Sequence, residues 1–221
     1  MSWYVRLTRF ASAHMVYAQH AQNSCGIASM MMVNFKQKKG TLLAGLAAAN
    51  AASTLPLVGG VLGSSIAEAA IANAVATEKG VYAAYTKVTG SPYDGSQYSD
   101  ADHFPKVLKN LGLGDWEVYD MPANSFAVTA KAAVDKAPII ARVEWNGGGA
   151  HFVVIDEFHM GYACVCDPWD GELHVVSMPR NQKVTYNAND RIISFSLGGT
   201  RNTYPAGNTG VFSEWIVRKK S

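Results

Sequence analysis

The stretch from 139 to 168, IIARVEWNGGGAHFVVIDEFHMGYACVCDP, decides the fold. Val, Ile and aromatic residues are concentrated in three runs within it, over 139–145, 151–158 and 161–166, and this composition is typical of β-strands. Glycines separate the first run from the second, and only a few residues separate the second from the third. Connections this short predict adjacent antiparallel strands.

The second and third strands predict a hairpin that places His151 beside Asp167. A three-residue turn at 158–160, followed by Gly161 in a left-handed conformation, sets His151 directly opposite Asp167. Residues in this relation share a sheet face and lie within side-chain reach. Each residue alone has a simpler interpretation, since a histidine at a strand start and an aspartate before a proline are usually structural.

The rest of the chain predicts an α+β fold rather than a parallel, doubly wound sheet, because helices come first and strands later. Alternation predicts further strands over 116–119, 172–177, 191–197 and 211–218. Helices are expected over 104–111 and 125–136, and a turn-rich loop over 90–100. Residues 1–22 are mixed and polar, without a clear pattern. The 221 residues suit a single domain, 1–221, with one sizeable core.

A helix is expected to begin at Cys25, with Asn23 or Ser24 as its N-cap. Its apolar face recurs every four residues, at Ile27, Met31 and Phe35. Lysines fill the predicted last turn, and Gly40 is expected to end the helix. The N-terminus of a helix favours a thiolate, the nucleophilic form of cysteine, over a thiol. A small buried residue at a helix start is the simpler interpretation of Cys25.

An uncharged segment follows, with no charged residue between Lys39 and Glu68. It is rich in Ala, Gly and Leu, and Pro56 and Gly59-Gly60 predict two helical pieces with a break near 55–60. We interpret 41–79 as a helical insertion that packs as a hairpin against the Cys25 helix. A partner-binding or site-covering element is the alternative. Membrane insertion is disfavoured, because so many small and polar residues give low hydropathy.

Composition narrows the partners and the compartment. Lys and Arg number 19 and Asp and Glu 17, a net charge of +2 that gives no reason to expect nucleic acid. Three cysteines make no disulfide framework and predict free thiols in a reducing compartment. The first residues lack a continuous apolar run, so no secretory signal peptide is expected. The protein is expected to be cytoplasmic at synthesis, and any export needs a non-classical route.

Four residues in the order Gln19, Cys25, His151 and Asp167 together fit nucleophilic catalysis. Cys25 is the expected nucleophile, His151 the base, and Asp167 the group that orients the imidazole. The side-chain amide of Gln19 and the Cys25 N–H are the expected oxyanion donors. Gln22 is the rival to Gln19.

No cofactor is expected. A metal held by Cys164 and Cys166 with His159 or His174 is disfavoured, because the spacing is weak and no second cysteine pair exists. His14, His20 and His103 have no recognisable context. Trp169 is interpreted either as a shield for the histidine and aspartate or as a core residue.

These motifs resemble the papain-like cysteine peptidases, and most of all the bacteriocin-processing, double-glycine type. The resemblance rests on Gln-x5-Cys-Gly at 19–26, Gly-Ala-His-Phe-Val-Val at 149–154, and Asp-Pro at 167–168. It covers about 15–40 and 100–178. It implies a Cys-bearing helix packed on an antiparallel sheet that carries His and Asp, and it implies the same four catalytic residues.

The expected function is therefore cysteine-dependent hydrolysis of amide bonds in a peptide or protein substrate. The same triad also serves two alternatives, a cell-wall peptide amidase and a toxin-type protein deamidase, because fold alone does not decide the substrate. A non-catalytic papain-like module that binds a protein partner through 41–79 is the third alternative.

Overall fold

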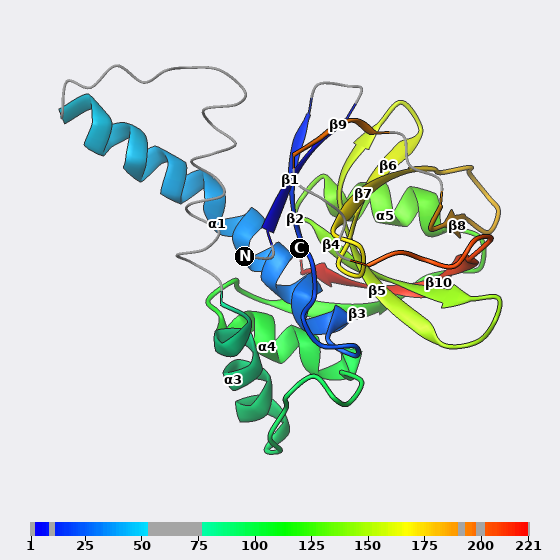
Figure 1. Ribbon diagram of the computed structural model, residues 1–221, viewed down its shortest axis with the longest axis horizontal. Coiled ribbons are helices and arrows are strands. Elements are labelled where there is room, and N and C mark those ends of the chain that lie inside the picture. The colour runs from blue at the N-terminus through cyan, green and yellow to red at the C-terminus, as the bar shows by residue number, and fades with distance from the viewer. Residues whose placement is uncertain (1–2, 9–11, 53–76, 190–192, 198–201, 221) are drawn as a thin grey trace.

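The computed structural model describes residues 3–8, 12–52, 77–189, 193–197 and 202–220, which form a mixed α+β structure (Figure 1). In chain order the elements are β1 (Trp3–Thr8), β2 (Ala13–Tyr17), α1 (Cys25–Ala52), α3 (Glu78–Thr89), the short 3-10 helix η1 (Ala101–His103), α4 (Phe104–Asn110), β3 (Trp116–Asp120), α5 (Phe126–Val134), β4 (Ile139–Trp145), β5 (Ala150–His159), β6 (Tyr162–Asp167), β7 (Glu172–Ser177), β8 (Thr185–Asn187), β9 (Ile193–Leu197) and β10 (Thr209–Lys219).

The strands form two antiparallel sheets. The larger has the order β3-β10-β4-β5-β6-β7, with β8 also paired to β10, and the smaller has the order β2-β1-β9. The predicted antiparallel arrangement of β4, β5, β6 and β7 is confirmed. Helix α1 contacts β5 of the larger sheet and β2 of the smaller one, so it lies between them.

Two apolar clusters lie on opposite faces of the larger sheet. One joins α1, α4 and the smaller sheet to residues such as Ile140, Val154 and Cys166. The other packs α5 against residues such as Val153 and Val165. Neighbouring residues of β5 and β6 therefore belong to different clusters, and these two strands are apolar on both faces.

Helix α1 begins at Cys25, as the sequence predicts, and Ile27, Met31 and Phe35 are buried. Its predicted end at Gly40 is wrong, because the helix continues to Ala52. The segment after Gly40 is rich in Ala and Leu, whose helix propensity outweighs the cost of about 1 kcal/mol for one glycine. The predicted break near 55–60 lies outside the described residues, as does most of the 41–79 insertion. No helix among the described residues is long and apolar enough to span a membrane.

The sequence pattern misses the elements that flank this helix. Strands β1 and β2 lie within residues 1–22, where the sequence shows no clear pattern. In β1 the apolar residues are interrupted by Arg6, which is fully buried and ion-paired with Glu172 at 3.0 Å. The prediction that a helical piece ends near Lys79 is also wrong. Thr77 is the N-cap of a separate helix, α3, whose Gly80 N–H it binds at 3.2 Å.

The hairpin between β5 and β6 differs from the prediction in its turn and in its register. His159 pairs with Tyr162, so the loop has two residues, Met160 and Gly161, with φ of 48° and 83°. Positive φ at both positions is the conformation that matches the twist of a two-residue hairpin loop. The ladder also shifts by one residue between Ile155 and Glu157. His151 therefore does not lie directly opposite Asp167.

Candidate active site

Cys25 lies at the start of α1, at the bottom of an open cleft, with 7% of its surface exposed. The turn before it is tied to the larger sheet, because the Gln19 N–H donates to the Pro168 carbonyl at 2.7 Å. The Ser24 hydroxyl donates to the Ala21 carbonyl at 3.0 Å and tightens the same turn. These bonds hold the start of α1 next to the end of β6.

The loop over 90–100 packs directly on this turn. The Asn23 amide donates to the Ser96 carbonyl at 2.7 Å, and its backbone N–H donates to the Gly95 carbonyl at 3.3 Å. Gly26 makes the close approach possible, since a Cβ atom there would lie 2.2 Å from the Ser99 hydroxyl. The glycine after Cys25 thus has a packing reason.

His151 and Asp167 meet, as the sequence predicts. The shortest contact joins His151 Nε2 to Asp167 Oδ1 at 2.8 Å, and both side chains are buried. Because Nε2 faces the carboxylate, Nδ1 is the ring nitrogen left for Cys25, which lines the same cleft and contributes to raising the pKa of His151. His151 therefore pairs with Asp167 on one side and lines the cleft with Cys25 on the other.

Asp167 accepts hydrogen bonds from more than His151. The Trp169 N–H donates to Oδ1 at 2.8 Å, and the hydroxyls of Tyr186 and Tyr204 donate to Oδ2 at 2.6 and 2.9 Å. A carboxylate surrounded by donors is held as the anion. Burial alone raises the pKa of Asp167, but the charge on His151 and these donors outweigh burial and hold it well below its usual range.

The charge on Asp167 acts back on the histidine. Burial alone lowers the pKa of His151, but the Asp167 carboxylate and its hydrogen bond outweigh burial and raise this pKa to about 10. The ring is therefore an imidazolium at neutral pH.

Aromatic rings cover the imidazole. Trp145 stacks on His151, with ring centroids 6.0 Å apart and planes at 19°, and Tyr204 meets the same ring edge-on at 6.3 Å. Trp169, interpreted from the sequence as a shield or as a core residue, is half-buried in the cleft and contacts Tyr204. Sequence reasoning missed Trp145, Tyr186 and Tyr204 as parts of the site. The position of Trp145, at the end of β4 before the glycine loop, was the one available signal.

Gln19 and Gln22 occupy different places. Gln19 is buried, and its amide nitrogen donates to the carbonyls of Ala21 and Gln22 at 2.9 Å each. Both of its N–H groups therefore hold the turn. Gln22 is exposed and lines the cleft beside Cys25. The role of Gln19 as an oxyanion donor stays a prediction, and of the two glutamines it is Gln22 that lines the cleft.

The cleft at Cys25 adjoins two further hollows. One hollow of about 270 Å³ is walled by aromatic rings, the glycine loop and His151, and its lining holds no Lys, Arg, Asp or Glu. A second, of about 310 Å³, shares Cys25 and Tyr98 with it and extends to Arg142 and Phe152. A third, of about 480 Å³, shares Arg142 and Phe152 and adds three aspartates, Asp100, Asp102 and Asp120. The shared residues make these hollows one groove.

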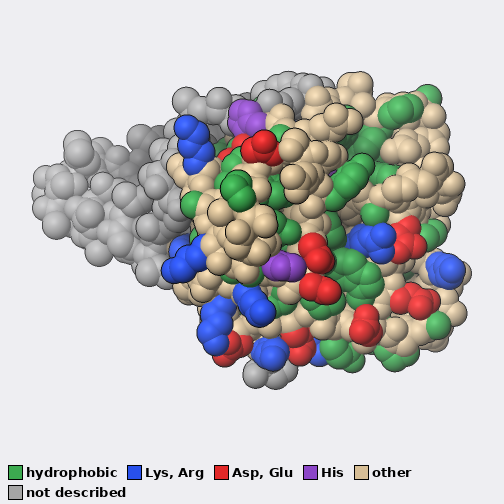
Figure 2. Space-filling model, turned by 90° about the horizontal axis from the view of Figure 1, so that it is seen from below, with side chains coloured by type: hydrophobic (Ala, Val, Ile, Leu, Met, Phe, Trp, Pro, Cys, Tyr) green, Lys and Arg blue, Asp and Glu red, His purple; other side chains and the backbone are tan. Residues whose placement is uncertain are grey.

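Charges of both signs are mixed on one face of the protein. Figure 2 shows the face on the side of α3 and α4, where basic and acidic side chains are interspersed and neither sign dominates. This distribution agrees with the small net charge of the whole chain.

Metal-ligating side chains lie close together away from Cys25. His14, Asp156 and Cys166 offer ligand atoms within 4.8 Å of one another, and so do His14, Glu157 and Cys164. Lys36 is ion-paired with the same Asp156 carboxylate, so positive charge is already supplied there.

The alternative of a metal held by Cys164 and Cys166 together with His174 is wrong. His174 lies directly opposite Val165, on the face of the sheet that does not carry Cys164 or Cys166, and it contacts Asp170 at 3.1 Å.

Comparison of the chain with protein-family models, with curated proteins and with solved structures finds no match.

Proposed function

We propose that the protein is a cysteine-dependent hydrolase of amide bonds with a papain-like arrangement of its Cys-bearing helix and sheet. The observation that carries the proposal is the buried pair of His151 and Asp167, 2.8 Å apart, whose histidine lines one cleft with Cys25 at the start of a helix. Nucleophile, proton carrier and orienting group are then in the order that covalent catalysis requires.

The first step is attack by the Cys25 thiolate on the substrate carbonyl carbon. The imidazolium of His151 then gives its Nδ1 proton to the leaving nitrogen, the carbon–nitrogen bond breaks, and a thioester remains. In the second step the neutral ring takes a proton from water, hydroxide attacks the thioester, and the acid and thiolate are released. Asp167 keeps the ring oriented throughout, through its bond to Nε2.

The negative oxygen formed in both steps needs donors. The first turn of a helix leaves its N–H groups unpaired, and the Cys25 N–H belongs to that turn. Gln22 supplies a side-chain amide from the wall of the cleft. Gln19 can serve in its place only by giving up its two bonds to the turn.

The groove supports a peptide substrate rather than a compact small molecule. It has three adjoining hollows, two of them lined by Cys25, and such a row of hollows suits a polypeptide bound in an extended conformation. Tyr98 stands on its rim with 77% of its surface exposed, in contact with two of the hollows.

The test uses iodoacetamide labelling and substrate turnover in parallel. The wild-type protein is expected to be alkylated at Cys25 at pH 6, and Cys25→Ala is expected to lose both labelling and turnover. Cys164→Ala is the matched control, because that thiol is buried and lies away from the cleft. Mass spectrometry of peptides incubated with the wild type distinguishes chain cleavage from conversion of glutamine to glutamate. Undiminished turnover by Cys25→Ala would contradict the mechanism.

A further inference from the structure

The β5–β6 hairpin has one more residue on β5 than on β6. Next to the turn, Glu157 pairs with Cys164, whereas two residues further along β5 Ile155 pairs with Val165. Asp156 lies between these pairs without an opposite residue, and this is a β-bulge. In a bulge of this kind two successive side chains point to the same side of the sheet, instead of alternating.

The bulge decides whether the proposed catalytic pair can form. Beyond it, Val154 pairs with Cys166, and continuing that ladder by one residue sets Asp167 opposite Val153, on the face of His151. Without the bulge, the ladder that starts at the turn would set Asp167 opposite Val154 instead. A one-residue slip moves every side chain to the other face, so Asp167 and His151 would then lie on opposite sides of the sheet.

Hydrophobic burial does not select between these two registers. Residues 153–155 of β5 and 163–166 of β6 are all buried and all apolar, on both faces. A register is well specified when one face is polar and the other is apolar, and weakly specified when the two faces are alike. Some other interaction has to favour the bulged register.

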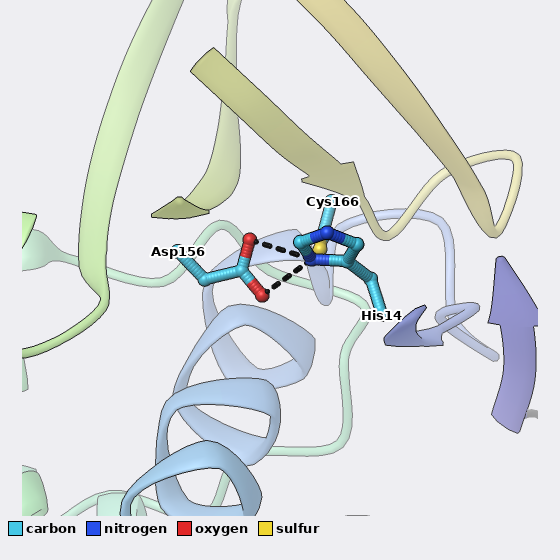
Figure 3. A group of neighbouring side chains, drawn as sticks. All are labelled: His14, Asp156 and Cys166. Atoms are coloured by element: carbon cyan, nitrogen blue, oxygen red, sulfur yellow. Dashed lines mark hydrogen bonds and ion pairs between the residues drawn. The ribbon is translucent and has the colours of Figure 1, made fainter. Parts of the chain in front are cut away.

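A charged cluster at the bulge provides that interaction, and Figure 3 shows its contact between His14 and Asp156. His14, on β2, contacts Asp156 through Nδ1 at 3.0 Å and Glu157 through Nε2 at 3.1 Å. Lys36, on α1, is ion-paired with Asp156. Two carboxylates thus face two cations, and the side chains of His14, Lys36 and Asp156 are each exposed by 10% or less.

The two contacts of the His14 ring require the bulge. One ring can contact Asp156 and Glu157 together only when both side chains lie on the same side of the sheet, which is the case in the bulge. In the regular register successive side chains alternate, and Glu157 would turn away from His14. Burial lowers the pKa of His14, but Asp156 outweighs burial and raises it well above its usual value, so both ring nitrogens donate.

We propose that His14 and Lys36 are positioning residues, which select the bulged register of β5 and thereby set Asp167 beside His151. This inference rests on the proposed function for its catalytic meaning. Its structural content, the pairing of His151 with Asp167, is measurable without a substrate.

The test measures the NMR signal of the His151 ring proton shared with Asp167, together with the rate of Cys25 alkylation at pH 6. His14→Leu leaves Asp156 paired with Lys36, and it is expected to lower the ring signal in the folded protein by at least half. Glu157→Ala removes the other half of the bridge from a partly exposed position, and it is expected to act in the same direction. Lys109→Met, which breaks an exposed ion pair with Asp115, is the control and is expected to change neither readout.

Deletion of Asp156 provides the decisive test. Removing Asp156 makes the pairs on both sides of the bulge adjacent, so that a regular strand already sets Asp167 on the face of His151. The deletion combined with His14→Leu and Lys36→Met is therefore expected to restore the ring signal that His14→Leu loses. Failure of this restoration would overturn the inference, and so would a full ring signal in His14→Leu accompanied only by a lower melting temperature. Loss and restoration of the signal in a protein that hydrolyses nothing would support the inference and refute the proposed function.

Discussion

Replacing Asp167 by Asn removes the charge that holds His151 as an imidazolium. Two unit charges about 4 Å apart interact by about 4 kcal/mol in the effective dielectric of a protein, which corresponds to about 3 pKa units. The pKa of His151 is raised from 6.5 to about 10, which is a shift of the same size. In Asp167→Asn, with burial no longer opposed, we expect this pKa to fall to about 6.5 or below.

The assay follows the chemical shifts of the His151 ring nitrogens between pH 5 and pH 10. At pH 7 the imidazolium fraction is expected to fall from nearly all molecules to about a quarter or less, and Cys25 alkylation at pH 6 should slow in parallel. Asp170→Asn is the control, since it removes a nearby buried carboxylate that contacts His174 instead. A His151 titration that stays near pH 10 in Asp167→Asn would refute the electrostatic argument.

Three further outcomes are expected. Gln22→Ala should lower kcat by roughly 10²-fold as an oxyanion donor is lost, whereas Gln19→Ala should mainly lower the free energy of unfolding, by about 1–3 kcal/mol; the reverse pattern in kinetics and urea titrations would assign the donor to Gln19. The free energy of unfolding should fall as pH rises from about 6.5 to about 10, because folding raises the pKa of His151, and also as pH falls below about 4, because folding lowers that of Asp167; urea titrations at pH 3, 5.5 and 9 check this. Gly171→Ala should lower stability by about 1–3 kcal/mol, because φ is 70° there and a Cβ would lie 2.8 Å from a tyrosine ring, and thermal unfolding measures it.

Local patterns were enough to predict the central strands and the pairing of His151 with Asp167. Strands β4 and β7 have the predicted bounds, and the contact of His151 with Asp167 is present, because alternation and glycine-rich connections act over a few residues. The hydroxyls that complete the aspartate site come from Tyr186 and Tyr204, 19 and 37 residues away. Nothing local to a tyrosine indicates that distant partner.

Charged residues inside apolar elements were the main source of error. Arg6 interrupts the apolar pattern that would have predicted β1. Nothing in the sequence indicated a role for His14, because its partner Asp156 is 142 residues away. The prediction for the end of α1 failed for another reason. A lysine-rich turn and a glycine are strong end signals only where the following residues are poor helix formers. The segment after Gly40 consists largely of alanine and leucine, which are good helix formers.

The prediction for His151 and Asp167 succeeded although both of its geometric premises were wrong. The turn has two residues instead of three, and one residue of β5 is bulged. Each change alone moves Asp167 to the other face of the sheet, and together they return it to the face of His151, displaced by two positions along the strand. A face prediction for a hairpin therefore depends on whether the total offset is even or odd, and not on the turn alone. The sequence signal for that parity was Asp156-Glu157, two adjacent carboxylates at the end of an apolar strand, which adopt one face only when a bulge allows it and cations balance them.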